Sequence, residues 1–141
     1  MIVLDANILF YSYSTGSPRY ERARTCVETL LSGTELIGLP WQTITAFLRI
    51  STNARLPGAR PAMEAAQEIE EWLNQPNVRL LSPADDHWQV LRRMMFEGQA
   101  FGPIVSDAEI AALTMENGAV LYSSDRDFAR FPGLRWVNPL E

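Results

Sequence analysis

The 141-residue chain has one cysteine, one histidine and no lysine. A lone cysteine, Cys26, excludes an internal disulfide, so we expect a reducing, cytoplasmic setting. One cysteine and one histidine also disfavour a zinc site, because such sites take several of these ligands. A serine–histidine–aspartate triad would have to use His87, and the chain has no nucleophile elbow to accompany it. We therefore expect His87 to be a surface residue.

Long apolar runs are absent too. No run approaches the ~20 residues needed to cross a bilayer, so no membrane span is expected. The first residues, Met-Ile-Val-Leu-Asp, lack the basic region of a signal peptide. There is no glycine-rich phosphate loop, internal repeat or low-complexity stretch. With 47% hydrophobic residues, the sequence predicts one domain over residues 1–141, large enough to bury roughly two-thirds of its unfolded surface.

Basic charge is scarce and consists of arginine alone. The chain has 17 acidic and 12 basic residues and a net charge of −5. A total this acidic argues against a general nucleic-acid coat protein. The charge is uneven, however, because the only charged residues between Leu36 and Met63 are Arg49, Arg55 and Arg60. That segment carries +3, which leaves −8 for the rest of the chain.

A second group of arginines flanks Asp125 and comprises Arg126, Arg130 and Arg135. Guanidinium groups bind phosphate oxygens in pairs, and such contacts position a nucleic-acid strand without reading its sequence. Arg49 and Arg126 are our candidates for this contact. Arg49 either faces a phosphate or pairs with a buried acid, and we expect Arg60 to be a solvated surface residue.

Short apolar runs alternate with helical patterns along the chain. Strands are predicted at Ile2–Leu4, Leu36–Leu39, Asn77–Leu81, Ala119–Ser123 and Arg135–Val137. Helices are predicted from Ser17 to Gly33, from about Trp41, over Ala62–Leu73, from Ser82 to Gly98, from Ser106 to Gly118 and over Asp125–Arg130. This alternation predicts an α/β fold, a three-layer α/β/α sandwich with a mostly parallel central sheet. The strand order is not predicted by periodicity.

Acidic residues lie where the predicted strands end. Asp5 follows the first strand, Asp125 follows the fourth, and Asp107 opens the helix before it. Ligands of parallel sheets bind beyond these carboxyl ends. Carboxylates forced together there would repel one another, and Mg²⁺ or Mn²⁺, which prefer oxygen ligands, would remove that cost. The pattern predicts metal-assisted phosphodiester hydrolysis.

Helix capping offers a second interpretation of these acids. Asp107 and Asp125 lie in the first turns of predicted helices, where a carboxylate favours the helix dipole. Asp127 and Glu109 each lie three residues after a serine, as in a capping box, and capping alone accounts for them. Asp5 has no such explanation, because an acid that ends a buried strand gains nothing from a cap.

Four motifs, in order, span residues 2–136: Ile2-Val3-Leu4-Asp5-Ala6-Asn7, the region from Leu39-Pro40-Trp41 to Phe47-Leu48-Arg49, Val105-Ser106-Asp107-Ala108, and Ser123-Ser124-Asp125-Arg126-Asp127-Phe128 continuing to Trp136. Together they resemble the motifs of PIN-domain ribonucleases, specifically VapC-type toxins of bacterial toxin–antitoxin pairs. The resemblance covers the whole chain, although none of the motifs is specific by itself.

The resemblance implies a Mg²⁺- or Mn²⁺-dependent endoribonuclease that forms a homodimer and binds a VapB-type antitoxin, which would occlude the site. It implies Asp5, Asp107 and Asp125 as the catalytic residues, with Asp5 and Asp107 as the principal metal ligands. Asp125 would complete the cluster, with Asp127 as a weaker ligand or a residue behind the ligands. It also implies that Asn7 and Ser124 orient acids or waters.

One position departs from the family pattern. Most PIN nucleases place a glutamate just before Phe47-Leu48-Arg49, and this chain has Ala46 there. The hypothesis that follows is a single well-held metal, with Asp127 or Glu109 compensating. Two alternatives stay open: a non-catalytic PIN-like module that binds RNA or protein, which Ala46 motivates, and a structure-specific DNA nuclease. The short chain argues against the second, because it leaves no room for an inserted arch.

Overall fold

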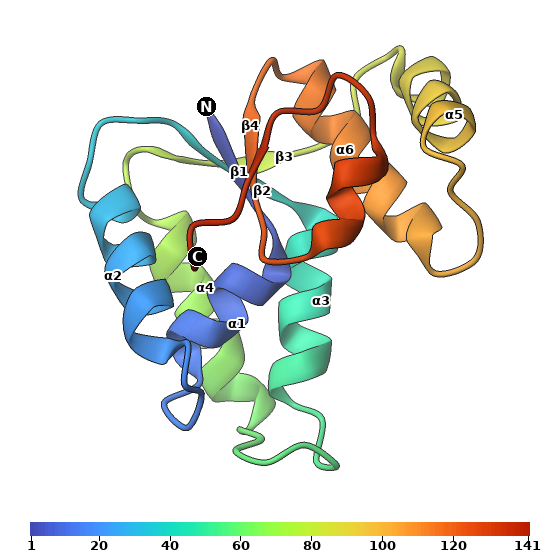
Figure 1. The fold of residues 1–141 in the computed structure, drawn as a ribbon. Helices are drawn as coiled ribbons and strands as arrows, with labels where there is room; N and C mark the ends of the chain where they lie inside the picture. The colour runs from blue at the N-terminus through green and yellow to red at the C-terminus, as the bar shows by residue number, and fades with distance from the viewer.

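Five short strands form a fully parallel sheet at the centre of the molecule (Figure 1). The computed structural model describes residues 1–141. The strands are β1 (Ile2–Leu4), β2 (Ile37–Pro40), β3 (Val78–Leu81), β4 (Val120–Tyr122) and β5 (Trp136–Val137), in the order β3-β2-β1-β4-β5. The first strand of the chain is therefore the middle strand of the sheet, and it has β2 on one side and β4 on the other.

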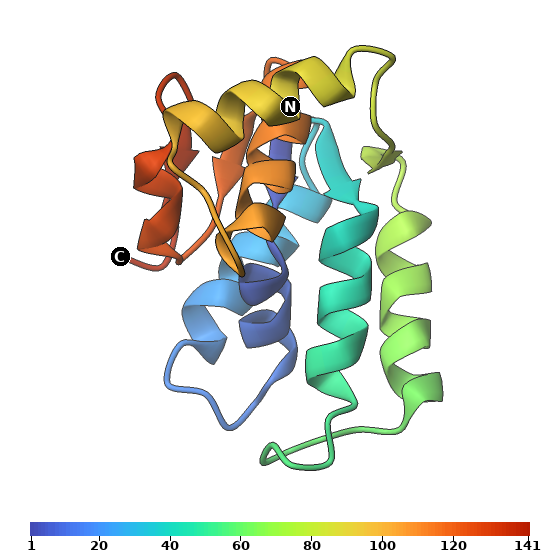
Figure 2. The same cartoon turned by 90° about the vertical axis from the view of Figure 1, so that its right-hand side faces the viewer.

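Helices cover both faces of the sheet. They are α1 (Ala6–Tyr13), α2 (Tyr20–Leu31), α3 (Trp41–Ser51), α4 (Ala62–Leu73), α5 (His87–Glu97) and α6 (Ile104–Glu116), with a short 3-10 helix, η1 (Arg126–Arg130). In Figure 2, α3 and α4 run side by side and α5 crosses the top of the molecule. The three-layer α/β/α prediction is confirmed. No helix is both long enough and apolar enough to cross a membrane.

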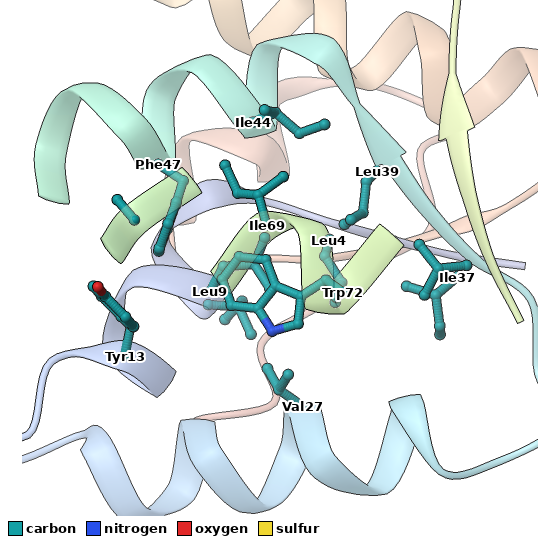
Figure 3. Close-up of a cluster of buried hydrophobic side chains, with 13 residues drawn as sticks. Leu4, Leu9, Tyr13, Val27, Ile37, Leu39, Ile44, Phe47, Ile69 and Trp72 are labelled. Carbon is teal, nitrogen blue, oxygen red and sulfur yellow. The ribbon is translucent and has the colours of Figure 1, made fainter. Parts of the chain in front are cut away.

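Each face of the sheet has its own apolar core, because successive residues of a strand point to opposite sides. Leu4 of β1 joins a core shared with α1, α2, α3 and α4, in which Phe47 and Trp72 pack edge to face with ring centroids 4.9 Å apart (Figure 3). The neighbouring Val3 joins the other core, made with α5, α6 and η1. The two cores fix the strand ends on which the acidic residues lie.

Helix α1 is absent from the sequence prediction, which assigned no element to residues 6–16. It begins directly after β1, with Asp5 as its N-cap residue. Three predicted helix starts are also displaced, and the first is that of α2, which begins at Tyr20 rather than at Ser17. Helix α6 begins at Ile104, after Pro103, so the capping box expected at Ser106 does not form, and α5 begins at His87 rather than near Ser82.

His87 is not the surface residue that we expected. Its side chain is only 14% exposed, and Nδ1 lies 2.6 Å from Oε2 of Glu116, whose side chain is 3% exposed. The other oxygen of Glu116 accepts a hydrogen bond from the Ala84 backbone N–H. This buried contact joins the start of α5 to the end of α6, because two polar groups that leave water together need each other as partners.

Candidate metal centre

Parallel pairing of β1 with β4 brings residues that are far apart in the sequence together at the carboxyl ends of these two strands. Ile2 lies opposite Val120 and Leu4 lies opposite Tyr122. The ladder continues for one more hydrogen bond, from the Asp5 backbone N–H to the Tyr122 carbonyl oxygen at 3.0 Å. Asp5 and Ser123, which directly follow β1 and β4, therefore lie next to each other at the carboxyl ends of the two strands. The sequence predicted this proximity on the condition that the two strands are neighbours.

Asp5 does act as a cap, contrary to expectation. Its Oδ1 accepts a hydrogen bond from the Ala6 N–H at 2.8 Å, at the N-terminus of the unpredicted helix α1. Its Oδ2 accepts a hydrogen bond from the Ser123 hydroxyl at 2.7 Å. The carboxylate is held at both oxygens, so its orientation is fixed by two elements at once.

Ser123 is the centre of this network and was missed in the sequence. Its side chain is fully buried. Besides donating to Asp5, its oxygen accepts hydrogen bonds from the Asn7 amide nitrogen at 3.2 Å and from the Asp125 N–H at 3.0 Å. Asn7 in turn accepts from the Ser124 backbone N–H at 3.3 Å. Ser124 thus contributes only its backbone N–H to the network. The orienting role predicted for Ser124 belongs to the hydroxyl of Ser123, which holds the Asp5 carboxylate.

Three carboxylates converge beside this network. One oxygen each of Asp107, Asp125 and Asp127 lies within 4.8 Å of the others. Asp107 comes from the first turn of α6, and Asp125 caps η1 by accepting from the Asp127 N–H at 2.9 Å. Asp127, expected to be the weaker candidate, is part of this group, whereas Asp5 lies outside it and faces the same pocket.

The pocket in front of these acids, here called the acidic pocket, has a volume of about 320 Å³. Its lining includes Asp5, Asn7, Asp107 and Asp125 on one side, and the α3 residues Gln42, Thr45, Ala46, Arg49 and Ile50 on the other. Of the two alternatives for Arg49, the structure favours the one in which it faces the site, since its side chain lines the pocket and forms no ion pair.

Two sequence candidates belong neither to the pocket lining nor to the carboxylate group or the hydrogen-bond network. Glu109 lies on α6, two residues beyond Asp107, but belongs neither to the carboxylate group nor to the pocket lining. Arg126 is largely exposed and pairs with Glu141 at 2.9 Å. Arg130, in contrast, lies close enough to lower the pKa of Asp107, although burial and acidic neighbours outweigh it.

The electrostatics of the pocket favour a cation. Burial, followed by repulsion from Asp125, Asp5 and Asp127, raises the pKa of Asp107 from 3.8 to about 7. Burial also raises the pKa of Asp5, against the hydrogen bonds from Ser123 and Ala6 that lower it. These carboxylates have far less cationic compensation than their negative charge requires, and a like-charged cluster of this kind is costly without a cation.

The donor set fits a divalent metal ion. It consists of carboxylate oxygens without cysteine or histidine, which suits Mg²⁺ or Mn²⁺ and not zinc. Asp107, Asp125 and Asp127 are the residues that could share one ion, and Asp5 faces the same space from β1. Arg49 lines the same pocket and is a cation to which an anionic group can bind.

The family model for the PIN domain matches residues 2–134. The chain belongs to the PIN-domain family. Ribonuclease VapC33 of Mycobacterium tuberculosis is 37% identical to this PIN domain over 141 residues, with 99% of each chain covered. The alignment runs the full length of both proteins and confirms the VapC-type resemblance found in the motifs.

Solved structures share the fold of this PIN domain. The VapBC2 complex of Rickettsia felis, solved with a promoter DNA fragment, matches with a TM-score of 0.74 and 15% identity over 98% of each chain. VapC20 of Mycobacterium tuberculosis, described as a sarcin–ricin loop cleaving toxin, matches with a TM-score of 0.70 and 17% identity, covering 96% of this chain and 99% of that one.

Ser123→Ala tests the hydrogen-bond network. The substitution leaves Asp5 Oδ2, the Asn7 amide and the Asp125 N–H without their shared partner, so we expect the free energy of unfolding to fall by about 1–3 kcal/mol. Urea denaturation measures the change. Ser124→Ala is the matched control, because the Ser124 side chain forms no hydrogen bond, and it should leave stability unchanged. Equal effects of the two substitutions would contradict the role of Ser123.

Asp107→Asn tests the repulsion between carboxylates. Because the folded-state pKa of Asp107 is raised, its contribution to stability is complete below the unfolded pKa of about 3.8 and is lost as pH rises through about 7. The neutral variant escapes this loss. In EDTA, it should exceed the wild type by about 1–2 kcal/mol at pH 8, after allowance for solvent screening, with a smaller difference at pH 5.

Thermal melts at the two pH values, with the protein otherwise identical, measure this difference. Added Mg²⁺ should raise the Tm of the wild type more than that of the variant, because the cation replaces the missing positive charge. A variant that melts lower than the wild type at both pH values in EDTA would instead show that the Asp107 carboxylate has a structural role.

Proposed function

We propose that this PIN domain is a metal-dependent endoribonuclease, the toxin of a toxin–antitoxin pair. The observation that carries the proposal is the convergence of Asp107, Asp125 and Asp127, the first two of which line one pocket together with Asp5 and Arg49. Support also comes from the 37% identical relative, which is named a ribonuclease and aligns over its whole length.

Different residues at the site would have different roles in phosphodiester hydrolysis. Asp107, Asp125 and Asp127 would hold Mg²⁺ or Mn²⁺, and Asp5, fixed by Ser123 and the Ala6 N–H, would complete the negative wall. A bound ion of this kind makes a water more acidic and polarises a phosphoryl oxygen. Arg49 would bind the non-bridging oxygens of the scissile phosphate across the pocket, which holds the phosphorus atom before the acids.

One ion, rather than two, fits the carboxylates that the pocket brings together. Helix α3 presents Ala46 to the pocket where a carboxylate would be needed for a second set of ligands. The carboxylates that meet come from α6 and the β4–η1 segment, and they form one group. Asp127 belongs to that group and Glu109 does not, so of the two candidates for compensation we propose Asp127.

The same Ala46 supports a second candidate, a PIN-like module that binds RNA without cleaving it. In that case the acidic pocket would retain its charge but lack catalytic activity. The two candidates differ in one measurable respect, since only the enzyme converts RNA to shorter products when metal is present. DNA cleavage by the same pocket would need a different substrate path, and the assay below includes single-stranded DNA for this reason.

A VapB-type antitoxin and a second copy of the chain are the proposed protein partners. The structural relatives include VapBC complexes, such as that of Rickettsia felis. Large apolar side chains stand exposed on α5 and the loop after it: Trp88 at 61%, Phe96 at 67% and Phe101 at 74%. An apolar surface of this kind, on a chain whose cores are otherwise closed, is typical of a surface that another protein covers.

Cleavage of RNA tests the function directly. Purified protein is incubated with single-stranded RNA or DNA in Mg²⁺, Mn²⁺ or EDTA, and products are resolved by size. We expect cleavage of RNA only with metal, and a loss of at least about 100-fold in kcat/KM for Asp5→Asn or Asp107→Asn, as for removal of a group that acts in the transition state.

Glu109→Gln is the matched control, because it removes an acid of α6 that lies outside the pocket, and it should leave the rate unchanged. RNA binding without cleavage under every metal condition would support the binding module instead. Metal-dependent cleavage of DNA alone would support the DNA nuclease.

Calorimetric titration with Mn²⁺ tests the number of ions. We expect one tight site per chain, weakened by Asp127→Asn and unchanged by Glu109→Gln, since only the first of these carboxylates belongs to the group. Proton release on binding should be larger at pH 6 than at pH 8, because Asp107 is protonated at the lower pH and must lose its proton to become a ligand. Two tight sites would rule out the single-ion arrangement.

A further inference from the structure

We propose that a second pocket, beyond the acidic pocket, binds a nucleotide of the RNA strand that flanks the scissile phosphate. This second site is here called the loop pocket, and it lies between the α1–α2 loop and the α3–α4 loop. The proposal rests on the ribonuclease function proposed above and adds to it a place where the substrate strand is held away from the acids.

The loop pocket has the size of a small-molecule site. Its volume is about 370 Å³, within the range of roughly 300–1,000 Å³ usual for ligand pockets. Its walls are Phe10 of α1, residues 14–17 of the first loop, residues 56–58 of the second loop, and Arg60. Both loops lie at the same end of the molecule, at the bottom of Figures 1 and 2.

The two pockets follow one another along the same pair of helices. On α1, Asn7 lines the acidic pocket and Phe10, three residues further on the helix, lines the loop pocket, which continues to Ser14 just beyond the end of the helix. On α3, Ile50 lines the acidic pocket, and the chain leads from there into the second loop. Helix α1, which separates the two pockets, has 8 residues and rises about 1.5 Å per residue. The two pockets are therefore close enough for one short RNA strand to occupy both.

Charge along this route suits a phosphate backbone. No acidic residue lines the loop pocket, which contains Arg60, whereas Arg49 lines the acidic pocket. With Arg55, these are the only charged residues between Leu36 and Met63. The lining of the loop pocket itself therefore carries positive charge alone, which favours RNA over a basic peptide, while Glu64, Glu68 and Glu71 share a separate pocket with Arg60 and Tyr13.

Arg60 is not the solvated side chain that we expected. Its Nη2 donates a hydrogen bond to the Tyr13 carbonyl oxygen at 3.2 Å, and its guanidinium lies 4.2 Å from the centroid of the Tyr13 ring. Its backbone N–H donates to the Ser51 carbonyl oxygen at 2.9 Å, which ties it to the end of α3. A guanidinium held in place this way loses less conformational freedom when it binds phosphate.

Apolar side chains complete the pocket. Phe10 belongs to its wall, and Leu56 is 40% exposed beside Pro57. Proteins bind single-stranded RNA with aromatic and apolar side chains that stack on its bases and with cationic side chains that contact its phosphates. The loop pocket offers both kinds of contact, and the acidic pocket offers the chemistry.

Gly16→Phe fills the loop pocket without disturbing the acids. A Cβ at Gly16 meets no atom within 4 Å, and the residue does not adopt a left-handed conformation, so this lining residue can accept a larger side chain without a clash. Gly16→Ala is the matched control. Arg60→Gln removes the cation and tests the phosphate contact separately. Thermal melts confirm that each variant is folded.

Cleavage is measured on two labelled RNAs, a short one that spans only the acidic pocket and one extended on both sides. Loss of one base-stacking contact costs about 1–3 kcal/mol, so kcat/KM for the long RNA should fall about 5- to 150-fold in Gly16→Phe and be unchanged for the short RNA. Arg60→Gln should lower kcat/KM for the long RNA only and reduce its dependence on salt.

Fluorescence anisotropy of the same RNAs, in Mg²⁺ with Asp107→Asn in every protein, measures binding without cleavage. If the wild type cleaves RNA but neither variant discriminates long from short RNA, the loop pocket is not a nucleotide site and the proposed function stands. If the wild type cleaves no RNA, the proposed function fails, and equal Kd values across the variants then overturn the loop pocket too. Weakened antitoxin binding with unchanged RNA binding would assign the pocket to a peptide.

Discussion

The pairing of β1 with β4 is the constraint on which the site depends. It places residues from the two ends of the chain at one level of the sheet, where the Ser123 hydroxyl bonds to Asp5 at 2.7 Å. The same pairing forces carboxylates close together in a partly buried space, which raises the pKa of Asp107 to about 7. The fold thus holds a cluster that is unfavourable by itself and that a cation relieves.

Much of this arrangement follows from the sequence. Apolar runs of strand length between helical patterns predicted the three layers, and acids directly after two of those runs predicted the edge of the sheet at which they meet. The physical reason is general, since parallel strands end on the same side. The motifs added the family, and the identity of 37% to a full-length relative agrees with them.

The remaining features depend on contacts between distant residues. Nothing in the local pattern separates Ser123 from Ser124, and only the direction in which β4 ends decides which hydroxyl is buried. The sequence prediction gave Asp5 no capping role because it did not recognise α1. This helix is eight residues long and only weakly amphipathic. Glu109 and Asp127 share one sequence pattern, yet only Asp127 reaches the cluster, because it follows the strand end and Glu109 lies on the helix beyond Asp107.

The bond between Asp5 and Ser123 spans 118 residues, and this separation has a consequence for synthesis. During synthesis the middle strand, β1, emerges long before β4, the neighbouring strand that leads into Ser123. Contacts so far apart in sequence form late, since the loop between them must close first. Until β4 and the residues after it have been made, Asp5 and Asp107 are present without the Ser123 hydroxyl and without Asp125, so the acidic pocket is incomplete.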